Sequence, residues 1–370
     1  MSAAGTDRTT VIGVGLCTPL GLTAEITVAE MAAGTLRFAE TEVEDGQGEP
    51  VRASRLGLLG PNLDRTARMT ALAKAALAQA LEGLFEHSIK EITLFLGLPS
   101  AEVGAEVDDE AITSALVKAA APDIRLTVAR VFRSGRAACF QALAAAQTEL
   151  HAPSAAPVVL VGAVDSLCDP ASLAYLVRET RVLGGMNRDG LIAGEGAGFL
   201  VLARPDSPPA RRAAPLGTIS KCVLTSERIP FTSREPSLAT GLTEAFRKLR
   251  LDPAVRLPVD VVLSCQTGES FWAHELARAH IRNISLMPEP LAITLVAESL
   301  GDVGAASGAI QIAAAVHPEK GVTGADPDAV PASARASQRA RRRALVYGAS
   351  DDGQIGACIV EGRSSQVLTS

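Results

Sequence analysis

The sequence predicts a layered α/β fold built around a buried, alanine-rich helix. Residues 131–150 read VFRSGRAACFQALAAAQTEL, a tight turn at Ser134-Gly135 followed by a helix that is apolar on nearly every side. A helix of this kind has to be covered all round. Two short aliphatic runs follow it, Val158–Val161 and Phe199–Leu202, and such runs are typical of buried strands. A buried helix held between buried strands forms the centre of a layered α/β domain.

The elements before this helix continue the α/β pattern. We predict strands at Thr9–Leu16, Ile92–Leu98 and Leu126–Phe132, helices at Thr23–Ala33, Leu63–Leu84 and Ala105–Ala120, and an irregular excursion with short strands over 36–61. In the helix from Leu63, Asp64 is the expected N-cap. Met69, Leu72, Ala76, Leu77 and Ala80 form its predicted inward stripe. Arg65 and Arg68, in its first turn, are interpreted as a solvated face.

The chain is expected to divide into two halves. A segment rich in Pro and Arg predicts a linker at 205–215, between an N-terminal half, 1–204, and a C-terminal half, 216–370. In the second half we predict strands at Leu216–Leu224, Val259–Leu263, Ala344–Tyr347 and Ile355–Val360, helices at Glu235–Leu251 (with Leu238 facing inward), Phe271–Ile281 and Val303–Val316, and a flexible loop at 317–340.

Composition limits the possible partners and cofactors. The net charge of −6 argues against a nucleic-acid or anionic-membrane partner, and no apolar run reaches the roughly 18 residues that span a bilayer. The N-terminus lacks the pattern of a signal peptide, so we expect a cytoplasmic protein. The six Cys show no CxxC spacing and are interpreted as reduced core thiols. The five His never recur at metal-ligand spacing, so neither a metal nor another cofactor is expected.

A family resemblance rests on several motifs in order along the chain. Residues 187–190 and 194–198, NRDG and GEGAG, closely resemble the "DRDGF…GEGAG" block of β-ketoacyl synthases. Residues 11–21, residues 63–69 (LDRTARM) and residues 304–308 (GAASG) resemble the opening strand and loop, the "LDRxxR" helix and the second Gly/Ala-rich helix of that family. The resemblance covers about residues 9–361.

The resemblance implies a thiolase-like fold, in which two similar α/β halves hold two buried central helices between their sheets. We therefore predict that Val131–Leu202 and Val259–Val316 superpose, and that the helices beginning near Gly135 and Asp302 pack together at the centre. The family usually forms dimers. We place the expected strand–strand subunit interface along Val158–Val161.

The same resemblance indicates that the condensing chemistry is lost. The positions of the nucleophilic Cys, the first His and the second His of the family are occupied by Arg136, Cys265 and Asp302, and the family's active-site Lys is replaced by Ala297. A guanidinium stays protonated and is not a nucleophile. The remaining pocket positions are Ser134, Gly135, Glu195, Thr267, Asp351 and Asp352.

Two classes of function remain open, together with a purely structural scaffold. The first is a β-ketoacyl-synthase-like protein of fatty-acid or polyketide-type metabolism without condensing activity, which binds an acyl chain or acts as a chain-length-factor-like partner subunit. The second is an acyltransferase that uses a non-standard nucleophile, Cys139 or Cys265. Expected partners are a second copy or an active ketosynthase. An acyl carrier protein is a further candidate, docking on Arg65 and Arg68 or on the basic run 339–343.

The replacement of the nucleophile predicts a specific contact. Arg136 lies at a helix N-terminus, which disfavours a cation, and an unpaired buried charge is too costly to keep. We expect a charge-assisted Arg136–Asp302 contact that plugs the cavity, bidentate if both guanidinium prongs reach the same carboxylate. Asp351 and Asp352 are the next candidates. In the alternative, Arg136 points into an open pocket and binds an anionic ligand.

Overall fold

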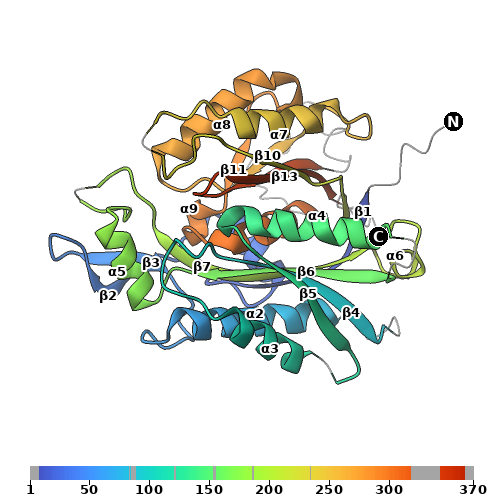
Figure 1. Ribbon diagram of the computed structural model, residues 1–370, viewed down its shortest axis with the longest axis horizontal. Coiled ribbons are helices and arrows are strands. Elements are labelled where there is room, and N and C mark those ends of the chain that lie inside the picture. Colours follow the sequence, from blue (N-terminus) through green and yellow to red (C-terminus); the bar gives the residue numbers. More distant parts are fainter. Residues whose placement is uncertain are drawn as a thin grey trace, which may run out of the picture.

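The helices and strands form alternating layers. A computed structural model describes residues 8–82, 84, 89–120, 122–152, 156–185, 187–233, 235–317 and 342–362. The central helix α4 (Ala138–Leu150) lies between two layers of strands, with α2 (Arg65–Glu82) and α3 (Asp109–Ala119) outside one layer and α7 (Thr240–Leu251) and α8 (Ser270–Arg282) outside the other (Figure 1). The thiolase-like fold predicted from the sequence is confirmed.

The strand order repeats between the two halves. Hydrogen bonds join ten strands in the order β11-β10-β12-β13-β8-β1-β7-β6-β4-β5, within a sheet of 13. In the first half β4 is parallel to β5 and β6, whereas β7 is antiparallel to β6 and β1. In the second half β10 is parallel to β11 and β12, whereas β13 is antiparallel to β12 and β8. The strands on this path are β1 (Thr9–Cys17), β4 (Glu91–Leu98), β5 (Arg125–Arg133), β6 (Val158–Ser166), β7 (Ala193–Ala203), β8 (Gly217–Ile219), β10 (Val261–Ser264), β11 (Ile293–Leu295), β12 (Arg343–Ala349) and β13 (Gln354–Gly362).

The remaining helices and strands lie outside this ten-strand path. They are α1 (Ala24–Ala32), β2 (Ala39–Glu44), β3 (Pro50–Ser54), α5 (Pro170–Arg178), α6 (Pro208–Arg212), β9 (Val223–Ser226), η3 (Ile284–Leu286) and α9 (Ala297–Leu300). The predicted linker 205–215 contains α6, and the domain bounds stay a prediction. The expected loop 317–340 lies, apart from His317, outside the described residues, and of the basic run only 342–343 are described.

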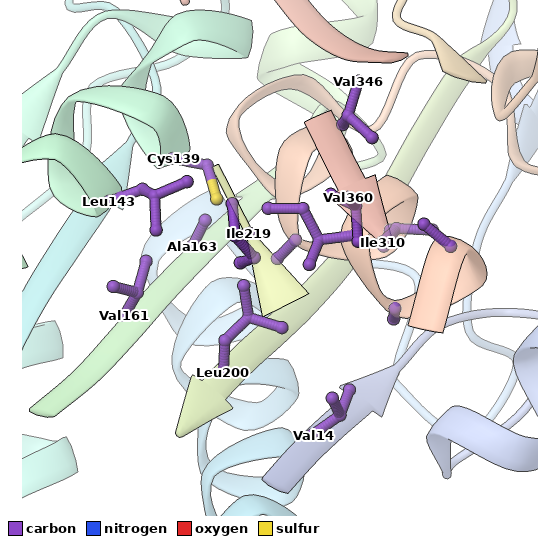
Figure 2. Close-up of a cluster of buried hydrophobic side chains, with 14 of the residues drawn as sticks. Val14, Cys139, Leu143, Val161, Ala163, Leu200, Ile219, Ile310, Val346 and Val360 are labelled. Carbon is purple, nitrogen blue, oxygen red and sulfur yellow. The ribbon is translucent and has the colours of Figure 1, made fainter. Parts of the chain in front are cut away.

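The two central helices meet in the core, as predicted. Each follows a short 3₁₀ turn, η2 (Gly135–Ala137) before α4 and η4 (Gly304–Ala306) before α10 (Ser307–Val316). A side chain at Gly308 would place its Cβ 2.8 Å from Cβ of Cys139, so the helices need glycine at this contact. Figure 2 shows Cys139 of α4 and Ile310 of α10 among apolar side chains from β6, β7, β12 and β13.

Two sequence predictions about this frame are wrong. Strand β6 is paired on both sides, with β4 and β7, so Val158–Val161 has no free edge for a subunit interface. Helix α7 begins at Thr240 rather than at Glu235, and Leu238 precedes it and is 55% exposed. In both cases the apolar run was detected correctly, but its neighbours in space were not visible in the sequence.

Candidate functional site

The candidate site is built where the two central helices begin. Gly135 and Gly304 both have φ of +49°, in the left-handed region that favours glycine. These glycines open η2 and η4, the equivalent turns of the two halves. Arg136 follows the first glycine, and Asp302 stands two residues before the second. The repeated backbone therefore brings the two side chains to the same place from opposite halves.

Arg136 is buried in a set of contacts that includes the predicted one. Its Nη1 lies 2.7 Å from Asp302 Oδ2, which confirms the predicted contact. Its Nη2 lies 2.5 Å from Asp351 Oδ1, and its Nε donates to the carbonyl of Ala349 at 2.9 Å. The guanidinium also stacks on Trp272, 4.3 Å from the ring centroid. The two Nη groups of Arg136 therefore bind different carboxylates, so the contact with Asp302 is not bidentate.

A second arginine, which the sequence reasoning missed, completes the site. Arg181 donates two hydrogen bonds to Glu269, at 2.8 and 2.9 Å, and its Nη1 lies 2.5 Å from Asp351 Oδ2. It also stacks on Phe231 at 4.5 Å. We call Arg136, Arg181, Glu269, Asp302 and Asp351 the ion cluster.

The sequence held one signal for these missed residues. Glu269 lies four residues after Cys265, next to a loop that had been assigned to the site from the sequence. Its carboxylate could therefore have been predicted as a site residue. Arg181 lies in a segment with no recognisable motif. The preceding Thr180 has φ of +56°, which is strained for a β-branched residue, and its carbonyl accepts a hydrogen bond from Asn187 Nδ2 at 2.7 Å.

Every charged group of the ion cluster has hydrogen-bond partners. Its two guanidinium groups face three carboxylates, and neutral donors supply the rest. The backbone N–H of Gly304 reaches Asp302 at 3.0 Å, and Thr267 and Trp272 donate to Glu269 at 3.0 and 3.1 Å. Burial opposes the charge on Arg136, but Asp302 and Asp351 raise its pKa above the ordinary value. Burial also opposes ionisation of Asp351, yet Arg136 and Arg181 hold the pKa of that carboxyl below 3.8.

The ion cluster borders two spaces, a small one that we call the inner cavity and a larger one that we call the outer cleft. The inner cavity has a volume of about 30 Å³ and is lined by Arg136, Asp302 and Asp351 among others. That is room for water and far below the roughly 300–1,000 Å³ of a typical ligand pocket. The outer cleft has a volume of about 580 Å³ and is lined by Arg181, Phe231 and Glu269 among others. Two residues, Val103 and Asp351, line both spaces. The prediction of a plugged cavity therefore fits this geometry better than an open pocket at Arg136.

Neither alternative nucleophile is placed for thiolate chemistry. Cys139 is fully buried, and burial raises the pKa of its thiol to about 12. Burial likewise raises the pKa of Cys265 to about 11, although Arg136 lies close enough to lower it. The Cys265 sulfur accepts a hydrogen bond from the backbone of Ala349 at 3.2 Å. All six cysteines are buried and free, as predicted.

The other predicted pocket residues divide into two groups. Gly135 lines the inner cavity, and the Ser134 carbonyl accepts a hydrogen bond from Ser350 Oγ beside it. Thr267 belongs to the shell of the ion cluster through its bond to Glu269. Asp352 is exposed in a turn, where its Oδ1 accepts from Gln354 N at 3.0 Å. The side chain of Glu195 contacts Arg68, and Glu195 lines neither of these spaces.

The prediction of a solvated face at Arg65 and Arg68 is wrong. Arg65 is 1% exposed and lies 2.8 Å from Asp165, whereas Arg68 is fully buried and makes a bidentate contact with Glu195 at 2.7 Å for both bonds. Asp165 Oδ2 in turn accepts from the backbone N–H of Ala305 at 2.9 Å, at the start of the second central helix. These arginines are internal structural groups, so they offer nothing to an acyl carrier protein. The Asp64 N-cap is confirmed by its 2.8 Å bond to Ala67 N.

Two findings concern the described part of the chain as a whole. Across the described ranges, no three His, Cys, Asp or Glu side chains are arranged to hold a metal ion. None of the helices described in the structure has both the length and the apolar character needed to cross a membrane.

Comparison with known proteins supports the fold. The sequence matches no protein-family model and no curated protein. The fold is similar to the ishigamide ketosynthase/chain length factor, with a TM-score of 0.73 at 18% identity, over 97% of this chain and 100% of that one.

Two further solved structures have the same fold. One is the ketosynthase from module 6 of the bacillaene synthase of Bacillus subtilis 168, with a TM-score of 0.70 at 13% identity over 97% of this chain and 72% of that one. The other is the AntDE:AntF complex, a type II PKS acyl-carrier protein with its ketosynthase bound to the hexaketide. It has a TM-score of 0.70 at 15% identity over 96% and 99%. The architecture is thus the thiolase-like fold of ketosynthases.

Proposed function

We propose that this chain is a non-condensing subunit that pairs with an active ketosynthase in the manner of a chain length factor. The observation that carries the proposal is the ion cluster. Arg136 occupies the position that the family resemblance assigns to the nucleophile, and two carboxylates hold it there. A buried, fully paired guanidinium neither attacks a thioester nor leaves room for another group to do so.

The inner cavity supports the partner role over acyl binding at this position. A volume of about 30 Å³ is far too small for an acyl chain, since ligand pockets typically measure about 300–1,000 Å³. Burial raises the pKa of the two candidate replacement thiols, Cys139 and Cys265, so both stay protonated at neutral pH. No observation in the described residues therefore favours the acyltransferase alternative. The ketosynthase/chain length factor pair of similar fold supports the partner role by analogy.

The subunit interface is proposed along β5. This strand is the end of the hydrogen-bonded path and pairs only with β4, so its other edge is open among the described strands. An unpaired edge of nine residues is a template for pairing with another chain. Arg125, Arg130 and Arg133 on this strand are exposed. Arg125 and Arg133 lie 3.5 and 3.2 Å from Glu91 and Asp109, so most of the charge along this edge is balanced within the chain and does not oppose pairing with another strand.

The proposal is tested by reconstitution. The chain should be co-expressed with an active ketosynthase of a type II pathway, and the mass of any complex measured by sedimentation. We expect a heterodimer that extends a malonyl-derived chain, while this chain alone shows no extension and takes up no label from an octanoyl thioester. A Cys-linked octanoyl adduct on this chain would support the acyltransferase instead. A strict monomer at micromolar concentration, with or without the ketosynthase, would refute the partner role.

A further inference from the structure

An acidic surface lies on the same side of the molecule as the outer cleft. Residues 102–110 read EVGAEVDDE, with five acidic residues and no basic one. The segment begins at the cleft, which Glu102 lines, and continues to a second, open groove that Glu106 and Asp108 line. That groove has a volume of about 700 Å³. One acidic segment thus connects two concave surfaces.

Among the charged residues that line the groove, carboxylates predominate. It lies where α2, α3 and α5 begin, and its charged lining residues are Asp64, Arg65, Lys74, Glu106, Asp108 and Asp169. Arg65 is buried and already paired with Asp165. Four carboxylates are therefore opposed by a single lysine, and the groove carries a net negative charge.

Asp169, which lines this groove, has a carboxylate oxygen without a partner in the described part of the chain, an observation independent of the net charge. The residue is 1% exposed, and its Oδ1 caps α5 by accepting from Ser172 N at 2.9 Å. Its Oδ2 has no hydrogen-bond partner among the residues that the structure describes. A buried carboxylate oxygen without a donor is unfavourable, because the group has lost its water and gained nothing in return.

We propose that this groove and segment 102–110 form the docking surface for a lysine- or arginine-rich face of a partner protein. Charge complementarity selects a basic partner and repels an acidic one. A metal ion does not fit, because no cluster in the described part of the chain has the required arrangement. The surface runs from the cleft to the groove, which is too extended for a single small cation. The proposal does not depend on the pairing with a ketosynthase, so the two can fail separately.

The experiment measures binding of fluorescein-labelled octalysine to the full chain by anisotropy, with octaglutamate as the opposite-charge probe. The test variant is Glu102→Gln, Glu106→Gln and Glu110→Gln together. Its matched control replaces three exposed glutamates that line no part of the groove, Glu149→Gln, Glu235→Gln and Glu298→Gln. Both variants change the net charge equally, so any difference between them reports on location. Asp169→Asn alone keeps the Oδ1 cap while removing the charge.

We expect octalysine to bind, at least tenfold more weakly in 300 mM than in 50 mM NaCl, because exposed charge pairs are screened by salt. The groove variant should lose at least fivefold in affinity, Asp169→Asn at least twofold, and the control variant less than twofold. Equal losses in the groove and control variants would show that octalysine senses only net charge, and would overturn the proposal. Absence of octalysine binding, or tighter binding of octaglutamate, would overturn it as well.

Discussion

Arg136 and Asp302, 166 residues apart in the sequence, meet at 2.7 Å between Nη1 and Oδ2. Each belongs to the segment that leads into a central helix of its own half, and the internal repeat of the fold brings the segments together. The family resemblance assigns the position of the nucleophile to Arg136 and that of one histidine to Asp302. A charge-assisted contact therefore stands where catalytic chemistry is expected, and its energetics can be tested.

Removal of Arg136 should be strongly destabilising. Arg136→Met leaves Asp302 and Asp351 facing an apolar side chain in the interior, and a broken buried pair typically costs about 3–5 kcal/mol. Guanidinium chloride unfolding should show this loss in the free energy of unfolding. The triple variant with Asp302→Leu and Asp351→Leu should recover part of it, since no charge is left unpaired. Arg247→Met, which breaks only the exposed pair with Glu244, should change little. A wild-type-like Arg136→Met would show that the cluster contributes nothing to stability.

Restoring a cysteine at Arg136 should not create condensing activity. Arg136→Cys supplies a thiol, but the family resemblance assigns the two histidine positions to Asp302 and Cys265 and the lysine position to Ala297. The thiol would also lie beside Asp302, and a neighbouring negative charge disfavours the thiolate. Malonyl-dependent chain extension by the purified variant is the measurement. Extension above the wild-type background would contradict the interpretation that several positions are lost together.

The contribution of Asp351 should depend on pH in a defined direction. Its folded-state pKa is held below 3.8, so its stabilisation is present above that value and is lost as the pH falls through the folded pKa. The stability deficit of Asp351→Asn relative to wild type should therefore be largest at pH 7 and shrink below pH 3.8. Urea unfolding of both proteins across pH 7 to 3 measures it. A deficit that grows on acidification would contradict the assigned cause.

The thiols should resist alkylation in the folded protein. Cys139 and Cys265 have pKa values raised to about 12 and about 11, so at pH 8 almost none of either is thiolate. Iodoacetamide at pH 8 followed by mass spectrometry should leave both unmodified in the native protein and modify them in 6 M guanidinium chloride. Rapid native labelling of either residue would revive the acyltransferase alternative.

Arg68 should be as important for stability as Arg136, although it lies outside the ion cluster. Arg68→Met leaves Glu195 buried without its bidentate partner, and we expect a loss of about 3–5 kcal/mol in the free energy of unfolding. Lys74→Met on the same helix is the control, because Lys74 is exposed and should have little effect. Equal stability of the two variants would contradict a stabilising role for the buried Arg68–Glu195 pair.

Local sequence patterns predicted the helices and strands. Contacts between residues far apart in the sequence decided which strands lie side by side. The apolar, nearly uniform surface of residues 138–150 was sufficient to identify a buried helix, because burial on all sides follows from composition. The strand at Val158 was also recognised from its apolar run. Its two neighbours were not, since any buried strand shows the same run, and the subunit interface was misplaced for that reason.

The sequence by itself determined the layered fold, the buried central helices and the Arg136–Asp302 contact. The layered fold and the buried helices follow from hydrophobic periodicity. The contact follows from a buried cation that needs an anion, together with the family resemblance, which implies that the positions of Arg136 and Asp302 face each other across one pocket. Only the tertiary structure decided that Asp351 is shared between Arg136 and Arg181, and that Arg65 and Arg68 are internal. The local sequence around an arginine in the first turn of a helix does not show whether the side chain faces water or a buried carboxylate. The carboxylates that pair with Arg65 and Arg68, those of Asp165 and Glu195, lie 100 and 127 residues away in the sequence. Only folding brings them into contact.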